Sequence, residues 1–251
     1  MMTTRKSLIT SVLILTGVIT FAQESPAPQM LLIHEDNVIV GKDAEYQQAG
    51  KGFVDLLKAS NFTGFNISGF RLDDYTYWYV MPIQHMADLD HSPFEELSQK
   101  VGKEKFESTM AAFDGNYDTH MDYIAIFNPE LSYKPEQLEA EGNDYRRWMY
   151  LYYNPVNQDK VVALAKEWKK LYEENDIPQG YTIYSNGLGH KGPVLVVHSW
   201  ASSPVELDRA MQARNEKLGE KGNELWKRTE KLTYKIENKT GWYLPELSYH
   251  P

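Results

Sequence analysis

The chain has 251 residues, no cysteine, and 35 acidic against 26 basic side chains, for a formal net charge of -9. Without cysteine there is no disulfide, no thiolate nucleophile, and no zinc or iron-sulfur site built on cysteine. The negative charge and the lack of a sustained basic stretch argue against nucleic acid as a partner, because phosphate binding needs clustered Lys and Arg. The length and a hydrophobic content of 42% suit one or two domains with their own core.

The N-terminus has the pattern of a secretory signal peptide. Arg5 and Lys6 precede an apolar run over residues 8–21, and small residues follow. The run is shorter than the roughly 20 residues of a membrane span, so an uncleaved anchor is the less favoured alternative. We expect residues 1–22 to be a signal peptide and residues 23–29 a disordered lead-in. The mature chain is then periplasmic or secreted, with no membrane span after cleavage.

The sequence contains an internal repeat. The pentapeptide Pro-Glu-Leu-Ser-Tyr occurs at 129–133 and again at 245–249, an offset of 116 residues. Similar segments recur near the same offset: Gly64–Ile67 with Gly180–Ile183 at 116, Trp78–Val80 with Leu195–Val197 at 117, and Val101-Gly102 with Leu218-Gly219 at 117. A fixed period indicates repeated structural units. We predict a first unit at residues 30–133, a linker at 134–145, and a second unit at 146–251.

Each unit has the same predicted order of elements. Strands show runs of aromatic and β-branched residues, and helices show apolar residues at a spacing of three or four. In the first unit we predict a strand at 30–34, a helix at 42–60, strands at 65–72 and 75–83, a helix opened by Ser92-Pro93, and a strand at 120–128. In the second we predict a strand at 148–153, a helix at 158–175, strands at 180–185 and 193–200, a helix opened by Ser203-Pro204, and a strand at 232–243. The order β-α-β-β-α-β is that of a ferredoxin-like unit.

Each such sheet has one face without helices, and two sheets can bury these faces by closing into a barrel. The predicted fold is therefore α+β, two tandem ferredoxin-like βαββαβ repeats that form an intramolecular dimeric α/β barrel. In this topology, and in the strand-to-helix connection Val40–Tyr46, the chain resembles the dimeric α/β-barrel superfamily. That superfamily includes stress-responsive α/β-barrel proteins, antibiotic-biosynthesis monooxygenases, NIPSNAP proteins and haem-binding chlorite dismutase-like proteins. The resemblance implies a cavity inside a fused pseudo-dimer.

Strand alternation predicts which side chains line that cavity. Val194, Val196 and His198 share one face of their strand, and the offset of 117 maps Tyr79 onto Val196 and Met81 onto His198. In the strand at 148–153, either Trp148, Tyr150 and Tyr152 or Met149, Leu151 and Tyr153 face inward. The predicted ligand-binding residues are Tyr75, Tyr77, Tyr79, Met81, Tyr150, Tyr152 and His198. Tyrosine faces and hydroxyls suit a small hydrophobic or aromatic molecule, although an ordinary aromatic core is the alternative.

His198 is the candidate catalytic residue, since it is the ionisable group predicted to face the interior of the second unit. Some members of the superfamily are cofactor-free oxygenases that use an interior His, and the haem-binding members take an axial His from their C-terminal half. The resemblance therefore implies His190, His198 or His250 as haem ligands, if haem is bound. We expect no cofactor, with haem as the alternative, and a hydrogen-bonded core histidine is the alternative to both.

Two further patterns predict no site. Residues 187–192 fit G-x-G-x-x-G, but a strand follows them, so they are predicted to form a hairpin loop rather than a dinucleotide site. His85 and His91 flank Asp88 and Asp90, but the second unit has no matching histidines, so we expect no functional metal site there. His34, at the end of the first predicted strand, is a candidate only for the rim of the barrel.

Three functions follow from these observations. The first is an exported barrel that binds a small hydrophobic or aromatic molecule. The second is an enzyme, either a cofactor-free oxygenase or a haem protein, that uses His198. The third is a structural module that binds a partner protein through its outer faces. An open cavity containing His198 favours the first two, and a filled barrel favours the third.

Overall fold

The structure is a computed structural model that describes residues 30–139 and 142–251. The predicted signal peptide and lead-in lie outside the described residues, and both stay predictions. The first unit consists of β1 (Met30–Val38), α1 (Asp43–Ser60), β2 (Ser68–Leu72), β3 (Thr76–Ile83), α2 (Pro93–Val101), α3 (Lys103–Ala111) and β4 (Tyr117–Phe127). The second consists of β5 (Tyr145–Tyr153), α4 (Gln158–Glu174), β6 (Thr182–Asn186), β7 (Val194–Ala201), α5 (Pro204–Leu232) and β8 (Thr233–Tyr243).

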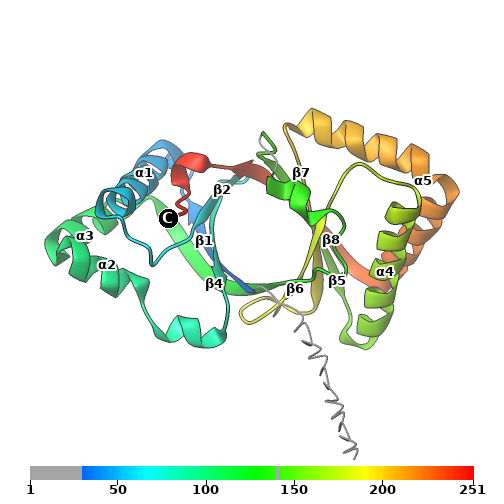
Figure 1. Cartoon of the computed structure of the whole chain (residues 1–251), viewed down its shortest axis with the longest axis horizontal. Coiled ribbons are helices and arrows are strands. Elements are labelled where there is room, and N and C mark those ends of the chain that lie inside the picture. The colour runs from blue at the N-terminus through cyan, green and yellow to red at the C-terminus, as the bar shows by residue number, and fades with distance from the viewer. Residues whose placement is uncertain (1–29, 140–141) are drawn as a thin grey trace, which may run out of the picture.

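The eight strands form one closed antiparallel barrel in the order β1-β3-β2-β8-β5-β7-β6-β4. The sheets of the two units join through β2 with β8 and β4 with β6. The helices lie outside the barrel, those of the first unit on one side and those of the second on the other (Figure 1). The predicted fold class, two ferredoxin-like units closed into an intramolecular barrel, is confirmed.

Strand register shows how the two units correspond. Trp78 lies opposite Glu35 and Phe70, while Val196 lies opposite Tyr150 and Tyr184. Trp78 and Val196 both line the barrel interior, so β3 maps onto β7 with an offset of 118 residues. The sequence comparison used 117. Because strand side chains alternate, a slip of one residue moves every side chain of the strand to the opposite face.

Equivalent glycines interrupt the last helix of each unit. Gly102, with φ of 91°, separates α2 from α3, and Gly219, with φ of 52°, kinks α5. Glycine adopts positive φ without the steric cost that a Cβ brings. The prediction of one continuous helix from Ser92-Pro93 was wrong, because the helix is interrupted at Gly102. The sequence repeat paired Gly102 with Gly219, and both residues interrupt a helix in the structure.

The repeated pentapeptide fastens the two units to each other. Ser132 Oγ accepts a hydrogen bond from the backbone N–H of Ile183 at 2.9 Å. Tyr133 forms an antiparallel β-bridge with Tyr181 of the second unit. Ser248 Oγ accepts the equivalent bond from Gly69 at 2.9 Å, and the C-terminal segment lies beside α1 and β2 (Figure 1). Each unit therefore ends by packing on the other unit.

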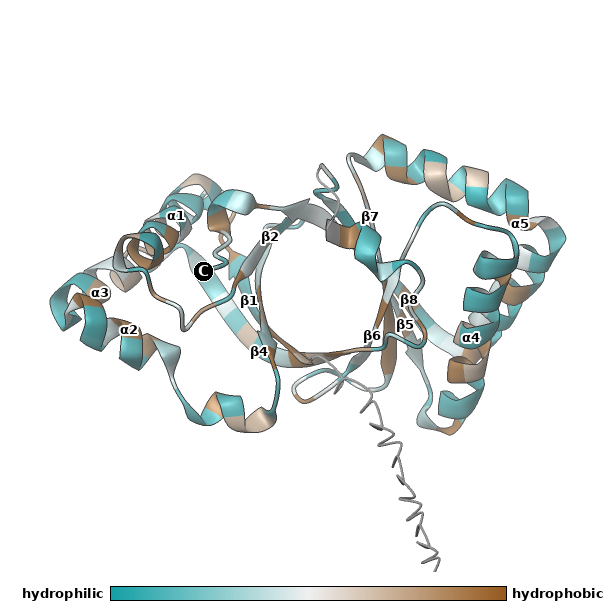
Figure 2. Cartoon of the chain, viewed as in Figure 1, coloured by the Kyte–Doolittle hydropathy of each residue, from teal (hydrophilic) through white to brown (hydrophobic). Residues whose placement is uncertain are grey.

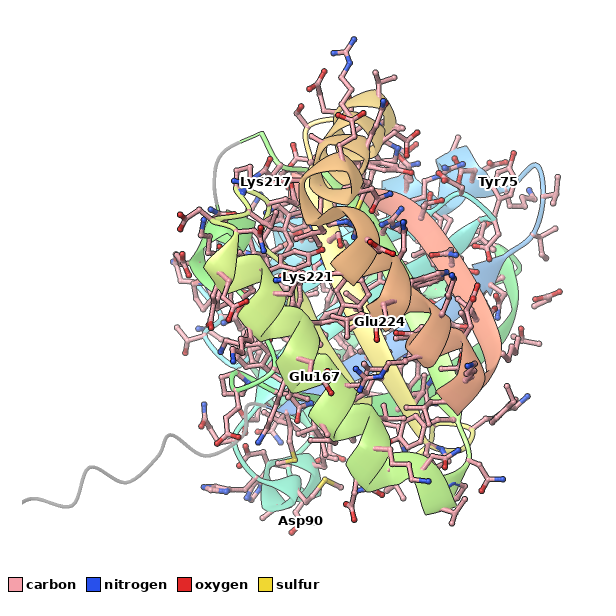
Figure 3. The ribbon with its side chains drawn as sticks, turned by 90° about the vertical axis from the view of Figure 1, so that its right-hand side faces the viewer. Tyr75, Asp90, Glu167, Lys217, Lys221 and Glu224 are labelled. Carbon is pink, nitrogen blue, oxygen red and sulfur yellow. The ribbon has the colours of Figure 1, made fainter. Side chains whose placement is uncertain are left out.

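Two helix–sheet cores flank the barrel. The helices carry both hydrophilic and hydrophobic residues (Figure 2), as expected for helices that cover one face of a sheet. Figure 3 shows α4 and α5 side by side over the strands of the second unit, with Glu167 on α4. Glu167 forms an ion pair with Arg228 of α5 at 2.6 Å. Over residues 30–139 and 142–251, no helix combines the length and the apolar character that crossing a bilayer requires.

Candidate functional site

The barrel encloses a cavity of about 770 Å³. This volume lies within the roughly 300–1,000 Å³ of typical small-molecule sites. The open interior disfavours the filled barrel expected of a purely structural module. The cavity wall includes aromatic side chains from both units, namely Phe70, Trp78, Tyr123, Trp148, Tyr150, Tyr184 and Tyr243.

Two tryptophans form the middle of the aromatic wall. The rings of Trp78 and Trp148 pack edge to face with centroids 4.8 Å apart, and Phe70 packs edge-on against Trp148 at 5.6 Å. Trp78 Nε1 donates to Glu35 Oε2 at 2.7 Å, which fixes the indole in place. Aromatic pairs in such geometries contribute roughly 0.5–1.5 kcal/mol each beyond area burial. The wall is therefore a rigid surface suited to a flat ring.

A charged pair lies against Trp78, and a pair of stacked rings lies in the same cavity wall. Lys239 Nζ lies 3.9 Å from Glu35 Oε2 and above the Trp78 ring. His190 stacks on Tyr150 with centroids 6.0 Å apart. Burial lowers the pKa of His190, so this ring is neutral near pH 7. Glu35 and Lys239 neutralise each other's charge, whereas Nδ1 of His190 is buried without a hydrogen-bond partner among the described residues.

His198 lies in the wall of the second unit and is 4% exposed. Its ring stacks on Trp148 at 5.2 Å with an interplanar angle of 5°, and Nδ1 lies 3.1 Å from Thr182 Oγ1. Nε2 is buried without a hydrogen-bond partner among the described residues. Burial, together with the charge of Arg146, lowers the pKa of His198 well below its ordinary value. The imidazole is therefore neutral at pH 7, and because the Thr182 hydroxyl can either donate or accept, the bond is compatible with both neutral tautomers.

Arg146 lies beside His198 in the same wall and is 6% exposed. Its Nη1 donates weakly to the backbone oxygen of Tyr145 at 3.4 Å, and its guanidinium lies 5.8 Å from the centre of the Tyr243 ring. Nε is buried without a partner among the described residues. Burial lowers the pKa of Arg146 to about 10, so the group stays protonated at pH 7.

The sequence-predicted residues fall into two groups. Tyr150 and His198 line the cavity, and Tyr152 stacks on Tyr150 at 6.1 Å farther along the same face. The prediction that the tyrosines and methionine of β3 and its preceding turn face the interior was wrong. Their side chains pack against α1, α3 and the C-terminal segment on the outer face, as the cores that contain Tyr75, Tyr77, Tyr79 and Met81 show.

The one-residue slip in the repeat explains this error, because it exchanged the two faces of β3. Trp78, Val80 and Pro82 occupy the interior positions instead. The role of His198 in binding or catalysis stays a prediction. His34, expected at the rim, lies on the outer face of β1, where it contacts Asp36 at 3.2 Å and Asp122 at 2.8 Å.

The sequence interpretation missed Arg146. A signal for it existed, since Arg146 lies two residues before Trp148 and four before Tyr150, on the face that alternation assigns to one side of the strand. It was overlooked because the predicted strand began at Trp148, whereas β5 begins at Tyr145. Tyr184 and Tyr243 were missed because alternation was not used to predict which side chains of their strands face the interior.

Two of the three histidines implied as haem ligands, His198 and His250, do not fit an axially ligated haem, while the third, His190, lines the cavity. Nε2 of His198 is buried under its neighbours and the ring is stacked on Trp148, so iron has no open approach to it. His250 uses Nδ1 for Asn66 at 2.6 Å and places Nε2 3.4 Å from the Tyr243 hydroxyl. Within the described part of the chain, no group of three or more His, Asp or Glu side chains is arranged to hold a metal ion.

Comparison with known proteins supports the fold. No family model matches the chain, and no curated protein matches it. A proposed monooxygenase of Lactobacillus acidophilus NCFM shares 12% identity with a TM-score of 0.53, over 86% of this chain and 94% of its own. An anthrone oxidase-like protein shares 13% with a TM-score of 0.54, over 88% and 92%. A chlorite dismutase of Candidatus Nitrospira defluvii shares 8% with a TM-score of 0.51, over 87% and 92%. At these identities the similarity establishes the fold alone.

Proposed function

We propose that the chain is an exported protein that binds a small aromatic molecule inside its barrel. The observation that carries the proposal is the cavity of about 770 Å³ with aromatic side chains from both units in its wall. Flat apolar ligands gain free energy in such a site from the area that they bury and from ring-to-ring contacts. The proposal requires no cofactor, and export rests on the signal-peptide pattern of residues 1–22.

Calorimetric titration with naphthalene-2-carboxamide, a neutral flat probe, tests this proposal. We expect one site per chain with micromolar affinity, about -8 kcal/mol. The control is Val196→Phe, which adds a ring to the cavity wall and should abolish binding. Unchanged binding in this variant would show that the probe lies elsewhere, and absence of binding by the native protein would count against the proposal. Native mass spectrometry of protein purified from its own source then identifies the natural ligand.

A second function, cofactor-free oxygenation, is supported by His198. This neutral imidazole lies in the cavity wall with an unpartnered Nε2, in a fold shared with an anthrone oxidase-like protein. In the tautomer in which Nδ1–H donates to Thr182, Nε2 carries the free lone pair, and it accepts a proton from an acidic C–H only if the bound substrate displaces the side chains that cover it. With anthrone and dioxygen the balanced products are anthraquinone and water.

Absorbance of anthraquinone under air tests this function. We expect turnover by the native protein, dependence on dioxygen, and loss of turnover in His198→Phe. Formation of anthraquinone at the uncatalysed rate by the native protein would contradict the activity for this substrate. Binding of the carboxamide probe in that case would leave the binding function in place.

A further inference from the structure

Arg146 carries a buried charge that the described residues do not neutralise. The side chain is 6% exposed, and its guanidinium forms no ion pair within 4 Å among the described residues. Removing a charge from water costs several kcal/mol unless an opposite charge or a set of hydrogen bonds replaces the water. One weak bond to a backbone oxygen and a distant ring are poor replacements. The cavity that Arg146 lines is where a compensating anion can bind.

Comparison of the two units shows that this polar corner belongs to the second unit alone. In the strand registers, Arg146 occupies the position of Leu31, and His198 occupies the position of Val80. Leu31 and Val80 also line the cavity. At these two positions the first unit contributes apolar side chains, whereas the second contributes a cation and a neutral imidazole. The polar side chains that the first unit adds elsewhere in the wall, among them Asn66 and Ser68, are uncharged. A ligand that fits both walls is apolar over most of its surface and acidic at one edge.

Acidic residues of the protein offer another counter-ion. Asp144 lines the cavity two residues before Arg146 and its charge acts on the guanidinium, but the two side chains are not within ion-pair distance. Glu141 precedes Arg146 by five residues and lies outside the described residues. The experiment below therefore tests both acids directly.

We propose that Arg146 binds the carboxylate of an aromatic acid whose ring lies against Trp78 and Trp148. The inference rests on the proposed binding function and specifies its ligand class. A guanidinium donates two parallel hydrogen bonds to a carboxylate, and such charge-assisted bonds are about twice as strong as neutral ones. The neighbouring His198 adds a neutral side chain that does not repel the guanidinium and does not compete for the acid.

Two probes of the same shape test the proposal. Naphthalene-2-carboxylate and naphthalene-2-carboxamide differ in charge at the edge that would meet Arg146. We expect the native protein to bind the acid at least tenfold more tightly than the amide. Arg146→Leu copies the residue of the first unit, and we expect this variant to keep the amide affinity within threefold and lose the preference for the acid. Arg146→Lys should keep part of the preference, because the charge remains without the planar pair of donors.

Two control variants test whether Asp144 or Glu141, rather than the carboxylate of a ligand, is the counter-ion of Arg146. Asp144→Asn and Glu141→Gln should keep or increase the preference for the carboxylate. An unchanged preference for the carboxylate in Arg146→Leu would overturn the proposal. Equal binding of both probes by the native protein would also overturn it. Either result leaves the proposed binding function intact. Binding of neither probe would overturn both. If Arg146→Leu fails to fold, Arg146→Lys provides the test: a reduced preference for the carboxylate supports the proposal, and an unchanged preference contradicts it.

Discussion

The backbone N–H of Gly69 donates a hydrogen bond to Ser248 Oγ at 2.9 Å, although the two residues are 179 positions apart. The bond fastens the end of the second unit to β2 of the first. It has a counterpart between Ile183 and Ser132 in the opposite direction. The reciprocal bonds explain why the same pentapeptide occurs at the end of each unit, since both copies perform the same structural task.

Loss of one of these bonds should destabilise the barrel. In Ser248→Ala, the buried N–H of Gly69 loses its acceptor, and we expect the free energy of unfolding to fall by about 1–3 kcal/mol. Ser132→Ala should have a similar effect, whereas Ser108→Ala on an exposed helix surface should change it by less than about 0.5 kcal/mol. Urea denaturation measures the three variants. Equal stability of all three would contradict the fastening role.

The ionisation of His34 should make stability depend on pH in the alkaline range. Burial lowers the pKa of His34, but hydrogen bonds and charges from Asp36 and Asp122 outweigh this effect and raise it to about 9. Because the folded pKa is higher than the unfolded value of 6.5, the contribution is complete below pH 6.5 and is lost as pH rises through 9. Partial exposure limits it to roughly 1–2 kcal/mol.

Thermal unfolding between pH 6 and 10 measures this contribution. In His34→Gln the decline in stability over that range should be smaller than in the native protein. His85→Gln, on an exposed loop, is the matched control and should leave the profile unchanged. A profile of His34→Gln that coincides with that of the native protein would show that the two carboxylates do not hold the histidine in its charged form.

His198 should act in the opposite direction, at acidic pH. Burial and the nearby Arg146 lower its pKa well below 6.5, so the folded state resists protonation while the unfolded state accepts it. Its contribution is present above pH 6.5 and is lost progressively as pH falls below that value. In His198→Phe the free energy of unfolding should therefore fall less steeply as pH decreases below 6.5. The variant should also lose about 1–3 kcal/mol at every pH, because the Thr182 hydroxyl is left without its partner. An unchanged acid limb, measured by unfolding from pH 4 to 7, would contradict a neutral buried imidazole.

Adjacent valines in β7 test which face lines the cavity. Val196 lies in the cavity wall, and Val197 packs on the helix–sheet core of the second unit. Val196→Phe should extend into open space and change stability by less than about 1 kcal/mol, whereas Val197→Phe should overpack the core and cost about 1–3 kcal/mol. The reverse order of stabilities in urea denaturation would assign the opposite faces.

The sequence allowed the fold to be predicted because a repeat and a strand-helix order are long-range patterns that tolerate errors of one residue. The faces of strands do not tolerate such errors. Trp78 and Tyr79 are neighbours that differ completely in environment, and an offset of 117 in place of 118 exchanged them. The slip was invisible in the sequence because aromatic residues occupy both faces of β3, so hydrophobic alternation did not mark the interior.

Arg146 shows a different limit. Its residue type is ordinary at a strand end, and its importance depends on burial, on the aromatic wall around it and on the lack of a carboxylate partner among the described residues. These properties arise only when β5, β7, β8 and the connection between the units come together. Sequence alternation could have placed the side chain on the Trp148 face, but it could not have shown that the charge was uncompensated.

The most direct measurement of the central claim is a crystal structure of the protein soaked with naphthalene-2-carboxylate. We predict that the probe lies inside the barrel, with its carboxylate within hydrogen-bond distance of the Arg146 guanidinium and its rings against Trp78 and Trp148. Density for the probe between the helices and the outer face of a sheet, or an interior filled by side chains with no room for it, would contradict the account.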